Sequence, residues 1–262
     1  MRYSYRLKDD KIKIDKILNI LNNKNYLYDE ENPDIVFVFG GDGTVLGAVH
    51  DYIDKIDKII FVGVNHGHLG FYTDFMEDDI EHMLEVIETK EYDICNLPLL
   101  EYCIQEEGLS HKGYALNEIS LISANRTMIM EIYINDLLFE TFRGTGVAIC
   151  TPSGSTAYNK SLGGAVVDIN LPSMQLTEIA SINNKVYTTL GSSMILGVNS
   201  VLKMIPIKSC ELIFNKDNQH QIFNSNITIE TKVSNKCVKL LTHKNRSFFQ
   251  RVKKAFIGDI ND

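Results

Sequence analysis

The chain has 262 residues, of which 44% are hydrophobic and 23% are charged, values close to those of an average globular protein. This composition argues against a disordered chain, and no apolar run approaches the roughly 18 residues of a membrane-spanning helix. Its 26 basic and 34 acidic side chains give a net charge of −8, opposite in sign to most proteins that bind duplex nucleic acid. We therefore expect neither a nucleic-acid partner nor a membrane association.

The first third of the chain alternates between strand-like and helix-like patterns. Residues 1–8 lack the apolar segment of a secretion signal, so we expect a cytoplasmic protein. Short β-rich runs predict strands at 3–7, 34–39 and 59–64, and apolar residues at helical spacing predict helices at 11–22, 44–53 and 77–89. Strands that alternate with helices are typical of a parallel sheet with helical crossovers.

After Pro98 the pattern changes to successive β-like segments. We predict strands at 99–105, 113–123, 128–134, 137–144, 147–151, 174–180, 200–207, 210–214 and 227–232, with a hairpin turn at Asn135-Asp136. A short helix is expected after Gly154-Ser155, and a terminal helix at 247–257. The fold class is then an N-terminal doubly wound α/β domain, residues 1–96 with 244–262, and a C-terminal antiparallel β-rich domain, residues 97–243. The terminal helix would return to the first domain.

Cysteines and a basic cluster suggest little specific chemistry. The five cysteines, at 95, 103, 150, 210 and 237, are odd in number and lack zinc-ligand spacing, so we expect buried free thiols. The basic cluster from Lys244 to Lys254 is interleaved with Phe248 and Phe249. A nucleic-acid or membrane patch is one interpretation, but we favour an amphipathic helix with a solvated face.

The most informative local motif is Gly40-Gly41-Asp42-Gly43-Thr44, between a predicted buried strand and a predicted helix. Glycines allow a phosphate to approach the backbone, and a helix N-terminus favours an anion. A carboxylate in such a turn would repel phosphate unless it has a task, either as a base for a hydroxyl proton or as a ligand of Mg²⁺. The alternative is a structural turn in which Asp42 caps the helix.

Three further motifs carry polar groups. The segment Thr151-Pro-Ser-Gly-Ser-Thr-Ala-Tyr158 offers hydroxyl donors and an aromatic face, although it is also a plausible helix entry with Ser155 as N-cap. The pair Asn117-Glu118 suits sugar hydroxyls, but by itself a surface strand pair is the simpler interpretation. The loop His66-Gly-His-Leu-Gly-Phe-Tyr72 follows a predicted strand, as the glycine motif does, so both could line one crevice at the carboxyl ends of the sheet.

Together these motifs resemble the NAD kinase family, whose members phosphorylate the 2′-hydroxyl of the adenosine ribose of NAD to give NADP. The resemblance is carried, in the family's order, by Gly40–Thr44, Asn117-Glu118, Thr151–Tyr158 and Leu176-Thr-Glu-Ile-Ala-Ser-Ile-Asn-Asn184, and it covers nearly the whole chain. It implies NAD as acceptor, ATP or inorganic polyphosphate as donor, Mg²⁺ carried by the donor phosphates, and a homodimer or homotetramer.

The resemblance also implies roles for individual residues. Asp42 would accept the proton of the ribose hydroxyl, and Gly43 would contact the substrate. Further dinucleotide contacts are implied for Phe71, Tyr72, Asn117, Glu118, Arg143, Thr145, Thr156, Ala157, Tyr158, Asn159, Lys160, Ser161, Ala180 and Gln219. The match at Gln219 is weak because the loop around it aligns poorly.

One departure from the family pattern lies at Arg143-Gly144-Thr145-Gly146, where the family has Arg-Gly-Asp-Gly. Threonine keeps a hydrogen-bonding group but brings no charge, so we expect altered affinity for the dinucleotide rather than lost chemistry. Two other functions stay open at this stage: a non-catalytic NAD(H)-binding sensor, which Thr145 favours, and a lipid kinase of the diacylglycerol type, which shares the Gly-Gly-Asp-Gly turn.

Overall fold

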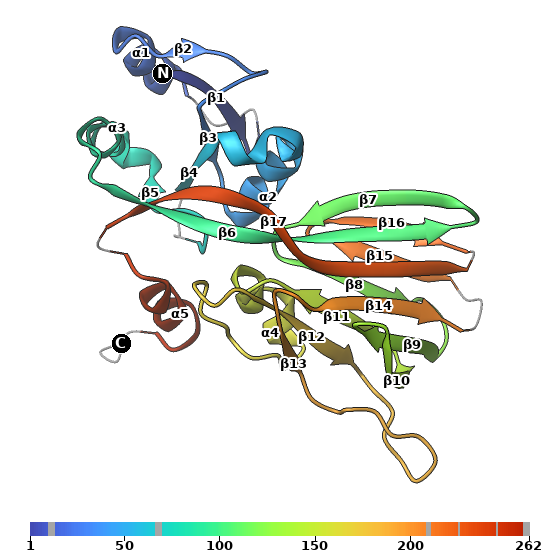
Figure 1. The fold of residues 1–262 in the computed structure, drawn as a ribbon. Helices are drawn as coiled ribbons and strands as arrows, with labels where there is room; N and C mark the ends of the chain where they lie inside the picture. Colours follow the sequence, from blue (N-terminus) through green and yellow to red (C-terminus); the bar gives the residue numbers. More distant parts are fainter. Residues whose placement is uncertain (10–13, 66–69, 208–210, 225, 245, 259–262) are drawn as a thin grey trace. The chain divides into compact units, whose positions relative to one another are not determined.

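The computed structural model describes residues 1–9, 14–65, 70–207, 211–224, 226–244 and 246–258, and it divides the chain into two compact units (Figure 1). Unit 1 consists of Met1–Leu97 and Lys236–Asp262, and unit 2 is Pro98–Asn235. The second boundary lies eight residues before the one that we placed at 243/244. The reason is that the last strand, β17 (Ile227–His243), runs on without a break, and its residues Lys239 and Leu240 pair with unit 1.

Unit 1 is built on a parallel sheet, as the alternation of strands and helices predicts. The end of β17 pairs with β4, β4 with β3, β3 with β1 and β1 with β2, each in parallel, and β5 pairs in parallel with β4. The bounds are β1 Arg2–Leu7, β2 Leu27–Tyr28, β3 Ile35–Phe39, β4 Ile60–Asn65 and β5 Phe75–Met76. All five residues of β3 are buried, because helices cover both faces of such a sheet.

The described helices of unit 1 are α1 (Asp15–Asn23), α2 (Asp42–Asp51), α3 (Ile80–Thr89) and α5 (Phe248–Phe256), with short 3₁₀ turns η1 (Ile53–Lys58) and η2 (Glu77–Asp79). One cluster of the core joins Ile17 and Leu21 of α1, Met83 and Leu84 of α3, and Phe37 of β3. Helix α5 belongs to this unit, so the terminal helix does return to the first domain as predicted.

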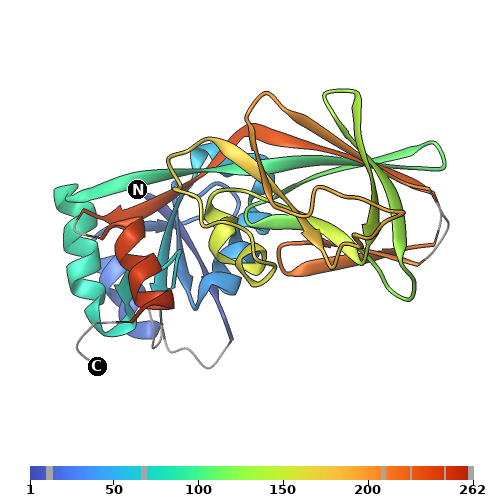
Figure 2. The ribbon, with the colours of Figure 1, turned by 90° about the horizontal axis from the view of Figure 1, so that it is seen from below.

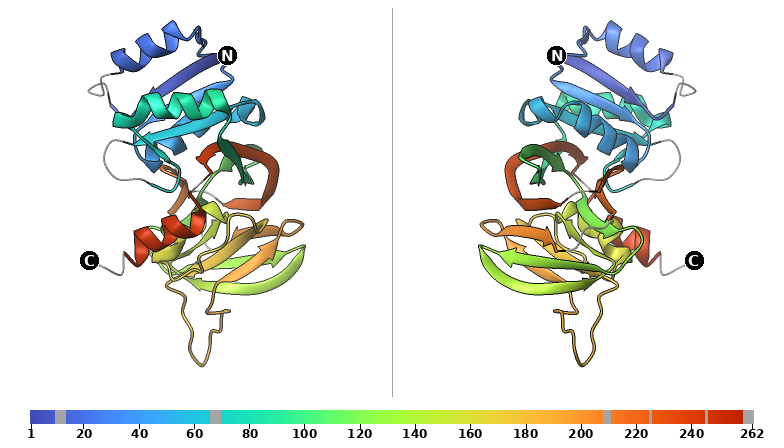
Figure 3. Two further views of the ribbon diagram at one scale, coloured as in Figure 1. Left: turned by 90° about the vertical axis from the view of Figure 1, so that its left-hand side faces the viewer. Right: turned by 90° about the vertical axis from the view of Figure 1, so that its right-hand side faces the viewer.

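Unit 2 consists of two antiparallel sheets with a shared core. One has the order β13-β12-β11-β8-β15-β16; the other joins β10, β9, β14 and the first part of β17, and β6 forms a hairpin with β7 and also pairs with β17 (Figure 2). The core residues alternate along the strands and come from both sheets, for example Ile119 and Ile149 from the first and Met130 and Met204 from the second. The segment between β12 and β13 extends away from the strands of this unit (Figure 3).

The strands of unit 2 are β6 (Tyr92–Glu106), which begins in unit 1, β7 (Leu109–Ala115), β8 (Glu118–Ser123), β9 (Met128–Ile134), β10 (Leu137–Gly144), β11 (Gly146–Cys150), β12 (Ser173–Ile179), β13 (Met194–Gly197), β14 (Val201–Pro206), β15 (Leu212–Lys216) and β16 (Gln219–Phe223). Its helical pieces are η3 (Ser153–Thr156) and α4 (Tyr158–Ser161). The turn at Asn135-Asp136 is confirmed: both residues have positive φ, 50° and 65°, as a two-residue hairpin requires.

Three expectations about local structure were wrong. The single strand predicted at 113–123 is two strands. The strand is interrupted because the backbone N–H groups of Leu116 and Asn117 donate to the carboxylate of Asp217. The strand predicted at 227–232 continues to His243. Of the four cysteines that the structure describes, Cys150 is buried, whereas Cys95, Cys103 and Cys237 are partly exposed; Cys210 lies outside the described residues. Among the residues placed by the structure, no helix is long and apolar enough to cross a membrane.

Candidate active site

The glycine motif forms the turn between β3 and α2 in unit 1. Gly41 is the N-cap of α2 and Asp42 is its first residue, so the alternative in which Asp42 caps the helix is wrong. A Cβ atom on Gly40 would lie 2.3 Å from Thr44 Oγ1, which explains a glycine at that position. Gly43 is exposed, and a Cβ atom built on it would meet nothing within 4 Å. The turn therefore leaves open space beside the first residue of the helix.

The Asp42 carboxylate is held by the backbone of a second turn, residues 70–73. Its Oδ2 accepts a hydrogen bond from the N–H of Phe71 and its Oδ1 from the N–H of Tyr72, both at 2.9 Å. Gly70 leaves room for this contact, since a Cβ atom there would lie 2.3 Å from Asp42 Oδ1. The structure thus brings together three of the predicted site residues, and it does so at the carboxyl ends of two neighbouring strands. Residues His66–Leu69 of the same predicted loop lie outside the described residues.

The side chains of Phe71 and Tyr72 have different surroundings. Tyr72 is buried, whereas Phe71 is partly exposed. The Phe71 ring stacks on that of Phe256, with centroids 5.9 Å apart, and lies 6.4 Å from the ring of Phe248. Helix α5 therefore packs against the turn that orients Asp42.

In unit 2, Asn117 and Glu118 are buried, with 8% and 9% of their surface exposed, so the surface-pair interpretation is wrong. The Glu118 carboxylate accepts a hydrogen bond from the backbone N–H of Tyr158, which brings two predicted residues together. Its Oε2 is buried without a hydrogen-bond partner among the described residues. Burial and, next, the negative charge of Asp217 raise the pKa of Glu118 to about 8, so the carboxyl group is mostly protonated at neutral pH.

Asp217 is a residue of this region that the sequence motifs did not single out. It lies in the two-residue turn between β15 and β16, with φ of 48°. Its Oδ2 accepts the N–H of Leu116 at 2.9 Å, and its Oδ1 accepts those of Asn117 at 2.7 Å and Glu118 at 3.2 Å. The only sequence signal was the turn-forming pair Asp217-Asn218, which identifies a hairpin but not its contacts.

The hydroxyl-rich loop that begins at Thr151 is held by hydrogen bonds to the backbone carbonyl groups of Leu116 and Asn117. The N–H of Thr151 donates to Asn117 O at 2.9 Å, and Thr151 Oγ1 donates to Leu116 O at 2.6 Å. A Cβ atom on Gly154 would lie 2.0 Å from Asn117 O, so this close approach requires glycine. Ser155 is not an N-cap; its buried hydroxyl accepts the N–H of Val167 at 2.9 Å.

The predicted contact residues of this loop divide into internal and exposed side chains. Asn159 is 1% exposed, and its amide is used within the unit: Nδ2 donates to Ser155 O and Ala165 O, and Oδ1 accepts from Thr177 Oγ1 at 2.7 Å. Thr156 is also buried and donates to Ser153 O. The side chains of Tyr158, Lys160 and Ser161 are exposed, and Ala157 is partly exposed.

The remaining predicted residues lie at strand ends of unit 2. The guanidinium of Arg143 lies 4.1 Å from the ring centroid of Tyr187, in the segment between β12 and β13. Thr145 is exposed, and its N–H donates to Ile179 O next to Ala180, whose φ is +46°. The predicted residues Arg143, Thr145 and Ala180 therefore lie close together. Gln219 is exposed at the start of β16 and, within the described residues, makes no hydrogen bond with the other predicted site residues.

The described parts of the chain contain no group of three or more His, Cys, Asp or Glu side chains that could hold a metal ion. Both oxygens of the Asp42 carboxylate are oriented by N–H donors. Each oxygen retains a lone pair for a proton or for a cation that other groups also bind.

Comparison with known proteins identifies the family. Residues 10–92 match the model of the ATP-NAD kinase N-terminal domain, and residues 116–237 match that of the ATP-NAD kinase C-terminal domain. The NAD kinase of Streptococcus gordonii is 38% identical over 94% of this chain and 90% of the relative, and that of Streptococcus mutans is 39% identical with the same coverage.

Two solved structures share the fold. One is yeast NADH kinase complexed with NADH, with a TM-score of 0.84, 17% identity, and coverage of 99% of this chain and 89% of the other. The second is an NAD kinase from Archaeoglobus fulgidus in complex with ATP, with a TM-score of 0.74, 22% identity, and coverage of 97% and 99%. The predicted two-domain fold class is confirmed, and the chain belongs to the NAD kinase family.

Proposed function

We propose that this NAD kinase transfers a terminal phosphoryl group from ATP or polyphosphate to the 2′-hydroxyl of the adenosine ribose of NAD, with Asp42 as the general base. The observation that carries the proposal is the Asp42 carboxylate at the start of α2, oriented by the N–H groups of Phe71 and Tyr72. With ATP as donor, the 2′-oxygen forms a bond to the γ-phosphorus while the bond from that phosphorus to the β–γ bridging oxygen breaks. ADP leaves with that electron pair, and the hydroxyl proton passes to Asp42.

The rate gain is divided between positioning and proton transfer. Alignment of the hydroxyl with the phosphoryl group contributes most, because phosphoryl transfer requires little covalent help from the protein. A general base contributes about 10²–10⁴-fold. Asp42 suits this role because its two hydrogen bonds fix the direction of the carboxylate before substrate arrives.

We propose dinucleotide contacts for the other predicted residues, with different support for each group. The protonated Glu118 carboxyl group is suited to donate a hydrogen bond to a sugar or base acceptor through its unpartnered Oε2. The exposed Tyr158 supplies a face for stacking, and Lys160 and Ser161 supply donors. Asn159 and Thr156 act by shaping the loop, since their side chains bond within unit 2.

A divalent cation fits this site only if the donor brings it. Mg²⁺ would be held by the phosphate oxygens, with Asp42 as the one carboxylate of the turn that could add to its ligands, since the described residues form no dedicated acidic cluster. When bound, Mg²⁺ neutralises charge on the phosphates.

We also propose that the protein self-associates and that it is cytoplasmic. The segment from Val186 to Val198 in unit 2 exposes several apolar side chains, namely Val186, Tyr187, Leu190, Ile195 and Val198. Exposed apolar groups gathered in one segment are typical of a protein–protein contact, which supports a homodimer or homotetramer.

The test is NADP formation from NAD and Mg²⁺ with either ATP or polyphosphate, for the wild type, Asp42→Asn and the control Asp54→Asn. Asp54 is an exposed carboxylate of η1 and does not belong to the site. We expect Asp42→Asn to bind NAD in a calorimetric titration but to lose about 10²–10⁴-fold in turnover, with Asp54→Asn unchanged. Near-normal turnover in Asp42→Asn would refute the assignment of the base. Wild-type protein that binds NAD but forms no NADP from either donor would instead be a sensor.

A further inference from the structure

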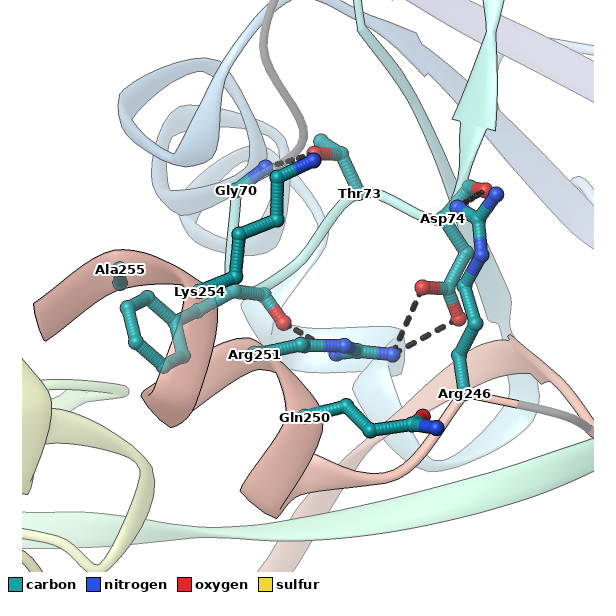
Figure 4. A pocket seen from close by; sticks show the side chains of 9 residues that line it. Gly70, Thr73, Asp74, Arg246, Gln250, Arg251, Lys254 and Ala255 are labelled. Carbon is teal, nitrogen blue, oxygen red and sulfur yellow. Dashed lines mark hydrogen bonds and ion pairs between the residues drawn. The ribbon is translucent and has the colours of Figure 1, made fainter. Parts of the chain in front are cut away.

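We infer that a pocket in unit 1 binds the phosphate chain of the donor, with Lys254 and Arg246 as its cationic contacts. The pocket lies between the 70–74 turn and helix α5 with the residues just before it (Figure 4). This inference rests on the proposed function, because it assigns a place to the donor of that reaction. Neither the glycine motif nor the predicted dinucleotide contacts include these two basic residues.

The pocket has the size of a small-ligand site. Its volume is about 500 Å³, within the range usual for ligand pockets. One wall is formed by Gly70, Thr73 and Asp74, and the opposite wall by Arg246 and by residues of α5. In Figure 4 the side chain of Lys254 points from α5 toward Gly70 and Thr73.

Its lining carries a net positive charge, with three cationic side chains and one carboxylate. The charge of Arg251 is paired within the protein, since its Nη2 donates to both oxygens of the buried Asp74 at 2.7 and 2.8 Å. Arg246 donates to the Asp74 carbonyl oxygen, so its charge is not neutralised there. Lys254 makes no ion pair or hydrogen bond with the residues that the structure describes. A positive cavity in a chain of net charge −8 favours a polyanion at this position.

One side chain of the lining also carries an unused hydrogen-bond donor. Arg251 is one of the lining residues, and its Nε is buried and has no acceptor among the described residues. A buried donor without a partner is costly, and a phosphate oxygen would supply the acceptor.

The position of the pocket identifies the phosphates of the donor. Two of its lining residues are those that meet Asp42: the N–H of Phe71 donates to Asp42 Oδ2, and Gly70 leaves room for Asp42 Oδ1. The phosphorus that is transferred must come to the oxygen that Asp42 deprotonates. The remaining phosphates of the chain then need cationic groups close to the 70–72 turn, which Lys254 and Arg246 supply.

The experiment compares Lys254→Gln with Lys253→Gln. Both lysines belong to α5 and both are exposed, but only Lys254 lines the pocket, so Lys253→Gln is a matched control for the loss of one charge. Michaelis constants are measured for ATP, for polyphosphate and for NAD, and tripolyphosphate binding is measured by calorimetry without NAD. We expect Lys254→Gln to raise the Michaelis constants of both donors about tenfold and to weaken tripolyphosphate binding similarly. The Michaelis constant for NAD and both values for Lys253→Gln should stay at wild-type levels.

Equal donor constants and equal tripolyphosphate binding in the two variants would overturn the inference, as would a rise confined to NAD. A rise of the Michaelis constant for ATP but not for polyphosphate would also overturn it, because Lys254 would then contact the nucleoside and not the phosphate chain. If the wild type forms no NADP but binds tripolyphosphate in a way that Lys254→Gln weakens, the pocket is confirmed and the proposed reaction is refuted.

Discussion

Replacement of Asp217 with asparagine should lower the free energy of unfolding of unit 2 by about 1–3 kcal/mol. The carboxylate accepts three backbone N–H groups, one on Oδ2 from Leu116 and two on Oδ1 from Asn117 and Glu118. An asparagine amide has one oxygen. With that oxygen facing Asn117 and Glu118, its NH₂ group faces the N–H of the buried Leu116, donor against donor, and the flipped amide leaves two N–H groups without an acceptor.

The assay is urea unfolding followed by circular dichroism at pH 5. This pH is chosen because burial and, next, Asp217 raise the pKa of Glu118 to about 8, so at pH 5 Glu118 is protonated in the folded wild type and does not repel Asp217. The loss of stability then reports the hydrogen bonds and not the relief of repulsion.

The matched control is Asp136→Asn, in another two-residue hairpin turn of this unit. Asp136 has φ of 65° and is exposed, and within the described residues its carboxylate accepts no hydrogen bond. Asparagine is tolerated in this conformation, so this variant should unfold at the same urea concentration as the wild type. If Asp217→Asn also unfolds there, the three hydrogen bonds do not stabilise the protein and the reasoning is refuted.

Two further predictions concern Glu118 and Gly70. The folded-state pKa of Glu118, about 8, lies above the ordinary glutamate value of 4.5, so its contribution to stability is complete below pH 4.5 and is lost as pH rises to about 8. Urea unfolding at pH 6 and pH 8 should therefore show the wild type losing about 2 kcal/mol more than Glu118→Gln, and equal losses would contradict the shift. Gly70→Ala places a Cβ atom 2.3 Å from Asp42 Oδ1, so the rate of NADP formation should fall at least about tenfold. The control is Gly197→Ala, which should leave the rate unchanged because no atom lies within 4 Å of the added Cβ. An unchanged rate in Gly70→Ala would show that the carboxylate need not keep this position.

Hydrophobic patterning predicted those parts of the fold in which it was continuous. The runs at 34–39 and 59–64 became β3 and β4 with shifts of one residue, since a strand buried on both faces is apolar throughout. Strands β2 and β5 have two residues each, too few to show any period. The end of β17 was missed because Ser234, Asn235 and Lys236 interrupt the apolar pattern, although the strand itself continues through them.

The glycine motif predicted the place of the candidate site better than its contacts. Strand order put Asp42 and the loop that ends at Tyr72 at the same edge of the sheet. That the carboxylate accepts the N–H groups of residues 71 and 72 depends on how the second turn closes, which no spacing encodes. The basic terminal cluster shows the same limit: helical spacing predicted α5, but only the folded structure shows that Lys254 lines a pocket and that Lys253 is not among its lining residues.

The protonation of Glu118 is the property of the site that was furthest from prediction. An ionised carboxylate only accepts hydrogen bonds, whereas a protonated one also donates, so the same residue recognises different ligand atoms in the two states. The sequence places a glutamate beside an asparagine, but its state depends on burial and on a carboxylate 99 positions later, Asp217. Asp217 fixes the backbone of the Asn117-Glu118 turn and at the same time raises the pKa of the side chain that the turn presents. One residue of a hairpin turn thus sets both the position and the hydrogen-bonding character of Glu118, and neither effect has a signature in local composition.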